Sequence, residues 1–193
     1  MTQHYQTLIQ ELLSEVRRSP AGTLSLQARK RLWISLVDGR IEEDGKRLLT
    51  ALDVWCVESG MPIWRRAFGC GDLLSNMLDV AVRASSGRLD PAEALAIRDE
   101  FYVTTIEDID YAASEYPAMF VAHAAANTIL TGTTTSVHDA DDGREDVDLE
   151  SEAFEPSFLV ASAFAGRLFE SGDPAKRRAF WEAYLLHSQG LFD

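Results

Sequence analysis

Residues 5–16 read YQTLIQELLSEV, and their apolar side chains recur at intervals of three or four positions. An α-helix has about 3.6 residues per turn, so this spacing places the apolar side chains on one face of a helix. They are Tyr5, Leu8, Ile9, Leu12, Leu13 and Val16. The stretch therefore predicts an amphipathic helix that buries this face against a core.

The same period returns along the whole chain, and turn-forming residues interrupt it at 19–22, 38–39, 59–60 and 85–87. Asp90-Pro91 and Asp173-Pro174 combine a capping carboxylate with a first-turn proline, which is a strong signal for a helix start. The short stretch Met61-Pro62-Ile63-Trp64 indicates a turn or a new helix start. A further helix is expected to open at Pro156, with Phe158, Ser162, Ala165 and Phe169 at helical spacing, and to end at Gly172.

These patterns predict an all-α fold, a single-domain bundle of about eight or nine helices over residues 1–193. In the second helix we expect Leu32 and Trp33 to face inward and Arg29, Lys30 and Arg31 to face largely outward. Residues 132–150 show no apolar period and no strand pattern, so we expect an exposed acidic loop near residues 132–155. In the helix before it, the run Ala124-Ala125-Ala126 favours close approach of a neighbouring helix.

The net charge of −13 is concentrated in two segments. Residues 90–115 contain eight acidic side chains and one basic one, and residues 139–155 contain nine acidic and one basic. Such a field repels nucleic acid and anionic membranes and attracts basic partners. The chain shows no basic leader and no apolar run of about 20 residues, so we expect a soluble, cytoplasmic protein.

The patterns of the common catalytic and metal sites are absent. No Gly-x-Ser-x-Gly sequence occurs, and the four histidines lack the close spacing of zinc ligands. Counted from Asp139, the acidic loop has Gly143 at position five instead of the six that an EF-hand requires. We therefore expect no enzyme activity, no metal and no cofactor. Cys56 and Cys70 are too few for a disulfide framework, which indicates buried or half-buried thiols.

His123 and Asn127 lie one helical turn apart on a mostly apolar helix. The interpretation we favour is a hydrogen-bonded pair in the core. The alternative is a pocket around His123 in a helical-bundle enzyme or small-ligand-binding protein. An acidic residue beside the histidine would support that alternative. A third, weaker interpretation, a transcriptional or scaffolding partner, lacks a basic recognition helix.

Three segments carry a resemblance to a known family. They are Leu24-Ser25-Leu26-Gln27-Ala28-Arg29-Lys30-Arg31-Leu32-Trp33, residues 51–58 with 61–64, and the ending over residues 172–185. The most specific of these is Arg177-Arg178-Ala179-Phe180-Trp181-Glu182-Ala183-Tyr184 within the ending. The chain resembles the all-helical immunity family numbered five among those of bacterial polymorphic toxin systems, and the resemblance covers most of its length.

The resemblance implies an immunity protein that binds and neutralises a cognate bacterial toxin, as in contact-dependent inhibition. It implies no catalytic residues and does not fix the oligomeric state. Because many secreted toxins are nucleases with basic clefts, we expect the acidic segments to make the toxin-binding surface. The expected residues are Asp139, Asp141, Asp142, Glu145, Asp146 and Asp148, with Glu107, Asp108 and Asp110 as a second patch.

Overall fold

The computed structural model describes residues 3–134, 138–169 and 171–191. Over these residues the chain forms eight α-helices and no strand, which confirms the predicted all-α class. The helices are α1 (Gln3–Arg18), α2 (Leu26–Val37), α3 (Glu42–Phe68), α4 (Leu73–Ser85), α5 (Pro91–Tyr102), α6 (Tyr116–Thr133), α7 (Pro156–Ala165) and α8 (Pro174–Gly190). Three short turns add η1 (Val103–Glu107, a π-helix) and the 3₁₀ turns η2 (Asp146–Asp148) and η3 (Ser151–Ala153).

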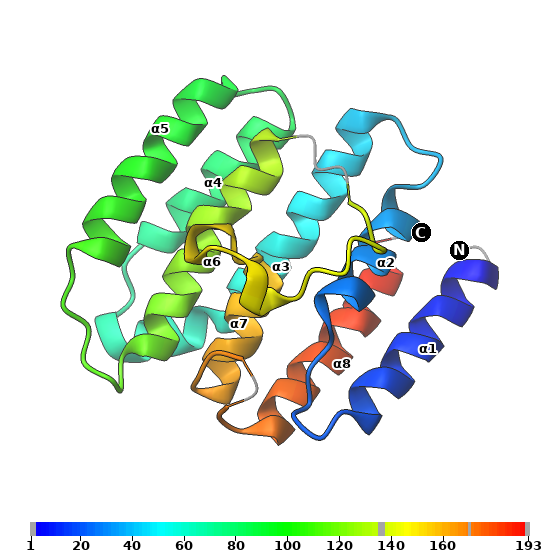
Figure 1. Ribbon diagram of the computed structural model, residues 1–193. Helices are drawn as coiled ribbons and strands as arrows, with labels where there is room; N and C mark the ends of the chain where they lie inside the picture. The colour runs from blue at the N-terminus through cyan, green and yellow to red at the C-terminus, as the bar shows by residue number, and fades with distance from the viewer. Residues whose placement is uncertain (1–2, 135–137, 170, 192–193) are drawn as a thin grey trace.

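Helix α6 lies at the centre of the bundle and packs against α3, α4, α5 and α7 (Figure 1). Ala124, Ala125 and Ala126 have no exposed surface, as their small side chains on an apolar helix predict. Small side chains let neighbouring helix backbones come close and bury more of each other. The central position of α6 explains why this helix is apolar on almost every face.

Residues 5–16 form the amphipathic helix that their apolar period predicts. All six apolar residues of α1 are buried, and the helix packs against α8 at the other end of the chain (Figure 1). The hydroxyl of Tyr5 donates to the carbonyl of Ser188 at 3.1 Å. The two ends of the chain therefore close the bundle together.

Both predicted capping signals are confirmed. The carboxylate of Asp90 accepts hydrogen bonds from the backbone N–H groups of Ala92 and Glu93 at the start of α5. Asp173 does the same for Ala175 and Lys176 at the start of α8. Each carboxylate satisfies N–H groups that the first turn of a helix leaves without a helical acceptor.

The break predicted at residues 59–60 is wrong, because α3 runs unbroken through Gly60 and Pro62. Gly60 is required by packing: a Cβ there would lie 2.9 Å from Cγ2 of Val121 on α6. Val57, Met61 and Trp64 are buried on one side of this part of α3. Burial of that stripe holds the helix together across the proline, whose ring donates no hydrogen bond.

The acidic loop begins two residues later than predicted, because Gly132 belongs to the last turn of α6. A Cβ at Gly132 would lie 2.7 Å from the carbonyl oxygen of Ala81 on α4, so the glycine lets two backbones touch. Residues 135–137 of this loop lie outside the described part of the chain. Its remaining part, residues 138–155, carries η2 and η3 and lies against the bundle (Figure 1). We call residues 138–155 the acidic strap.

Helix α7 is shorter than its pattern predicts. It ends at Ala165, and Gly166 adopts the left-handed conformation that commonly terminates helices. Phe169 therefore lies outside the helix, with a φ of 54° that is rare for a residue other than glycine. Its ring still packs against Phe158, with centroids 5.7 Å apart.

Candidate functional site

Two basic residues of α2 hold the acidic strap against the bundle. The guanidinium of Arg29 donates to both carboxylate oxygens of Asp146, with Nη1 3.1 Å from Oδ2. The ammonium of Lys30 donates to Asp142. This hydrogen bond lowers the pKa of the Asp142 carboxyl below its usual value. The strap is therefore fixed at two points by charge-assisted hydrogen bonds.

The prediction that Arg29 and Lys30 face outward is wrong. Arg29 has no exposed surface, and its guanidinium lies 5.4 Å from the ring centre of Trp181 and 5.7 Å from that of Phe158. The strap places Asp146 against this buried cation. The ion pair offsets the free-energy cost of burying the charge of Arg29. Only Arg31 follows the prediction, with a side chain that is 45% exposed.

Asn127 holds the other end of the strap. Its amide group donates to the carbonyls of Glu152 and Phe154 at 3.0 and 2.8 Å, and its oxygen accepts from Arg98 on α5. The prediction of a hydrogen-bonded pair between His123 and Asn127 is therefore wrong, because the amide of Asn127 joins α5 to the strap instead. One buried amide therefore links α5, α6 and the acidic strap.

His123 packs edge-on against the ring of Tyr102, with centroids 5.1 Å apart. Within the described part of the chain, its Nε2 atom is buried without a hydrogen-bond partner. Burial, and then the positive charge of Arg98, lower the pKa of His123 to about 4. The alternative interpretation, a catalytic or ligand-binding pocket around His123, required a carboxylate beside the histidine. The charge that acts on its pKa is instead the cation of Arg98.

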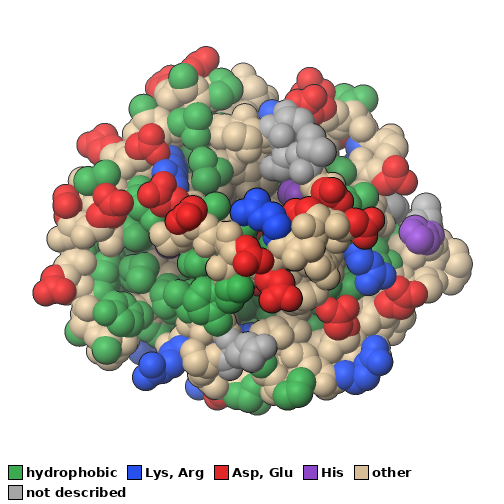
Figure 2. Space-filling model, in the orientation of Figure 1, with side chains coloured by type: hydrophobic (Ala, Val, Ile, Leu, Met, Phe, Trp, Pro, Cys, Tyr) green, Lys and Arg blue, Asp and Glu red, His purple; other side chains and the backbone are tan. Residues whose placement is uncertain are grey.

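The second acidic patch lies at the end of η1 and in the turn before α6. Glu107, Asp108 and Asp110 are all exposed there. Burial raises the pKa of Tyr102, and the charges of Glu152 in the strap and, more weakly, Glu107 raise it further. The two acidic segments, far apart in sequence, therefore act on the same tyrosine. Figure 2 shows acidic side chains over the face that carries α5 and the strap.

The six acidic residues predicted in the strap divide into two groups. Asp142 and Asp146 form the ion pairs with α2, where their side chains are 28% and 16% exposed. The others, Asp139, Asp141, Glu145 and Asp148, are exposed, and Asp142 is also an exposed residue despite its ion pair. Within that second group, Asp139 and Asp148 also accept backbone N–H groups of the strap itself. The strap thus uses some carboxylates to fix its own shape and presents the rest to solvent.

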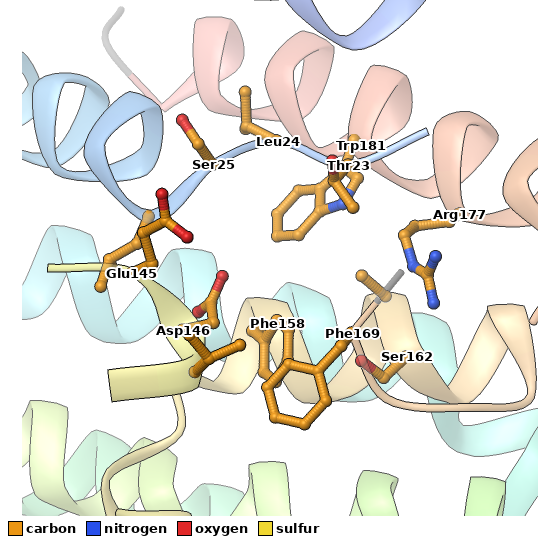
Figure 3. Close-up of a pocket in the computed structure, with 13 residues that line it drawn as sticks. Thr23, Leu24, Ser25, Glu145, Asp146, Phe158, Ser162, Phe169, Arg177 and Trp181 are labelled. Carbon is orange, nitrogen blue, oxygen red and sulfur yellow. The ribbon is translucent and has the colours of Figure 1, made fainter. Parts of the chain in front are cut away.

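A hollow of about 220 Å³ opens beside the strap, between α7, α8 and the segment before α2 (Figure 3). Sequence reasoning did not identify this hollow, which we call the strap hollow. Phe158, Phe169 and Leu24 give it apolar walls, and Ser162 and Trp181 are also among the residues that line it. The only signal in the sequence was a serine within the apolar stripe of α7.

Other kinds of site receive little support from the described residues. Among these residues no three His, Cys, Asp or Glu side chains come close enough to hold a metal ion. Cys56 is buried, whereas Cys70 is exposed, which corrects the expectation of a sheltered thiol. None of the described helices combines the length and apolar character needed to cross a membrane.

The described residues thus form a helical bundle that presents carboxylates around a small hollow. The comparisons with known proteins show the family of this bundle. The family model of immunity protein Imm5 matches residues 9–188, and the chain belongs to this family of immunity proteins. No curated protein matches the chain. Membership in this family of immunity proteins implies a role in immunity to a toxin that the chain binds.

Proposed function

We propose that this protein binds a cognate bacterial toxin in the cytoplasm and neutralises it by covering its active or binding surface. Membership in the Imm5 family supports the immunity role. The observation that carries the binding mode is the acidic face, which combines the strap with the patch at residues 107–110. In this proposal the protein makes no chemical change in the toxin and binds neither nucleic acid nor membrane.

The fixed shape of the strap favours tight binding. Because Arg29, Lys30 and Asn127 already hold the strap, little conformational entropy is lost when a partner docks on it. The carboxylates at Asp139, Asp141, Glu145 and Asp148 then meet basic side chains without first having to be ordered. Asp142 and Asp146 hold the strap to α2 through their ion pairs and contribute the area that stays exposed.

The acidic face also selects the partner. A nuclease binds phosphates with lysine and arginine side chains, and an acidic protein surface competes for the same groups. Attraction between such surfaces speeds association, to roughly 10⁸–10⁹ M⁻¹s⁻¹ at low salt. We therefore propose a basic toxin, with a nuclease as the best-fitting class.

The test uses the toxin encoded by the adjacent reading frame, in a catalytically inactive form. We expect a stable complex whose association rate falls by roughly tenfold or more as salt rises from 0.05 to 0.5 M, because added ions screen exposed charges. No complex with that toxin would overturn the immunity role. A salt-independent association rate would overturn the acidic binding mode alone.

Matched variants separate the acidic face from net charge. The test variant combines Asp141→Asn, Glu145→Gln and Asp108→Asn. The control removes three exposed acidic charges from α3 and α4 through Glu43→Gln, Glu58→Gln and Asp79→Asn. We expect the test variant to slow association at low salt several times more than the control. Equal effects would show that only the total charge matters.

A further inference from the structure

Exposed apolar side chains gather at one end of the bundle, where α3 ends and α6 begins. Among the described residues eleven large apolar side chains are exposed, and five of them lie within residues 68–73 and 103–116. These five are between 39% and 46% exposed: Phe68, Leu73, Val103, Ile109 and Tyr116. We call them the end patch. Single exposed apolar residues are common on proteins, whereas a group of them marks a contact surface.

Contacts within the fold hold the segments of the end patch together. The ring of Phe68 at the end of α3 packs edge-on against Tyr111, with centroids 5.7 Å apart. The hydroxyl of Tyr111 donates to the carbonyl of Thr105 in η1. The carboxylate of Glu115 accepts the N–H of Ala112 at 2.8 Å, which closes the turn before α6. The end of α3, η1 and the start of α6 therefore form one surface with a fixed shape.

The π-helical turn η1 is an independent indication of function at this end. Such turns are rare in proteins and occur frequently at functional sites. In η1 the N–H of Asp108 donates to the carbonyl of Val103, five residues earlier, at 2.9 Å. Thr105 is buried and Ile106 packs against the core, while Val103 and Glu107 are exposed. The turn thus presents both an apolar and an acidic side chain to solvent.

Acidic side chains border the end patch at η1 and in the turn that follows. Glu107, Asp108 and Asp110 are exposed there. Figure 2 shows hydrophobic and acidic side chains together at the lower left, where Figure 1 places this turn and the start of α6. Arg65 and Arg66 are exposed in the last turn of α3. The rim is therefore acidic at η1 and basic at the end of α3, so a partner must be basic where it meets η1.

We propose that the end patch anchors an amphipathic segment of the toxin. This inference rests on the proposed function, because the toxin supplies the segment. Its apolar side chains cover Val103, Ile109 and Tyr116, and its lysine or arginine side chains meet the acidic residues at 107–110. Membership in the Imm5 family supports a toxin as the occupant, and the charge at η1 favours a basic segment over an acidic one.

The acidic rim and the end patch contribute differently to binding. Exposed charges mainly speed association, and added salt screens them. Apolar contacts that become buried at the centre of an interface supply most of the binding energy and slow dissociation. Because ring contacts and hydrogen bonds already fix η1 and the following turn, little entropy is lost on binding. We therefore expect the end patch to determine the lifetime of the complex.

Matched pairs of threonine variants test the anchor against inactive toxin. The test variant combines Val103→Thr and Ile109→Thr, which keep a branched Cβ and add a hydroxyl. The control combines Val82→Thr and Ile41→Thr, at positions near the end of α4 and before the start of α3 that are 39% and 64% exposed. We expect the test variant to dissociate roughly tenfold faster than wild type, with an unchanged association rate. The control should match wild type, and circular dichroism checks that both variants fold.

The outcomes distinguish this inference from the immunity role. Equal dissociation rates for the test and control variants would overturn the anchor. The immunity role and the acidic binding mode would then stand, because complex formation and the salt dependence of association test them separately. If the toxin does not bind the wild-type protein at all, the immunity role fails. In that case the end patch loses its assigned partner, and the inference fails as well.

An NMR spectrum of the wild-type complex locates the contact without any substitution. We expect the methyl resonances of Val103 and Ile109 to shift when the toxin binds, while those of Ile41 stay in place. Resonances of the end patch that do not move would overturn the inference.

Sedimentation of the free protein tests the competing occupant, a second copy of this chain. We expect the wild-type protein and the test variant to sediment alike, as monomers. Self-association of the wild type that the test variant abolishes would show that a second copy covers the end patch, and would overturn the inference.

Discussion

Arg29 has no exposed surface, and its guanidinium donates to both carboxylate oxygens of Asp146, a residue 117 positions further along the chain. This ion pair joins α2 to the acidic strap. It places a fixed charge pair next to the aromatic rings of Trp181 and Phe158. The shape of the acidic face therefore depends on a cation that solvent does not reach.

We predict that Asp146→Asn lowers the free energy of unfolding by about 3 kcal/mol, because it leaves the charge of Arg29 buried without a full partner. Urea denaturation at pH 7 measures this change. The control is Glu11→Gln, which breaks the exposed ion pair with Arg31, where the side chains are 57% and 45% exposed. That control should cost less than about 1 kcal/mol. Equal costs would show that Asp146 does not compensate the buried charge.

The contact between α4 and α6 gives a second prediction. Gly132→Ala places a Cβ 2.7 Å from the carbonyl oxygen of Ala81, so the two helices must move apart. We expect thermal or urea denaturation to show a loss of about 1–3 kcal/mol. Gly190→Ala is the matched control, because nothing lies within 4 Å of a Cβ at that helical position. The idea of a required close contact would be wrong if both alanines were tolerated equally.

Glu155 gives a prediction about pH. Burial raises its pKa from 4.5 to about 7, although the nearby charge of Arg29 opposes the shift. Between these two values the folded protein holds a proton that the unfolded chain has released, so the group destabilises the fold as pH rises through this window. We expect Glu155→Gln to stabilise the protein by on the order of 1–3 kcal/mol at pH 8. Below pH 4.5 the gain should disappear.

Urea denaturation of Glu155→Gln and wild type at both pH values tests this sign. Glu150→Gln removes a charge from an exposed position of the same strap and should change stability by less than about 0.5 kcal/mol. A stabilisation by Glu155→Gln that is larger in acid than at pH 8 would contradict the proposed cause.

His123 has the opposite dependence on pH. Its folded pKa of about 4 lies below the ordinary value of 6.5, so the unfolded chain binds a proton that the folded chain does not. The contribution of His123 to stability is complete above pH 6.5 and is lost as pH falls toward 4. We expect the stability of His123→Gln relative to wild type to improve by about 2 kcal/mol between pH 7 and pH 5.

An NMR titration of the imidazole ring checks the same point directly. We expect the ring of His123 to remain neutral at pH 5. If its titration midpoint lay near 6.5, burial and the charge of Arg98 would not act on it as described.

Local patterns predicted most of the helices. The apolar stripe of α1 and the capping carboxylates Asp90 and Asp173 act within one or two turns, so their effects are visible in a short window of sequence. The roles of Gly60 and Gly132 were harder to predict, because a glycine that ends a helix and a glycine that permits a close contact look the same in sequence. What distinguishes them is a partner helix, and α6 and α4 come from other parts of the chain.

The candidate site was predicted in part. The acidic segments were visible as charge, but their division into supporting and exposed carboxylates was not. In the sequence, Arg29 and Lys30 follow the pattern of a solvated helix face. Their partners in the strap, Asp146 and Asp142, lie more than a hundred residues further along the chain. The strap hollow had no signal beyond Ser162, because its walls come from α7, α8, the strap and the segment before α2.

The sequence alone determined the all-helical class, the starts of its capped helices and the concentration of negative charge in two segments. These features follow from the helical period, from side chains that reach their own backbone and from composition, which all act locally. Only the tertiary structure decided which carboxylates bind Arg29 and Lys30, where Asn127 joins α5 to the strap, and that a hollow opens beside Trp181. Each of these depends on groups that are distant in sequence, and burial sets their energies only once the helices have packed.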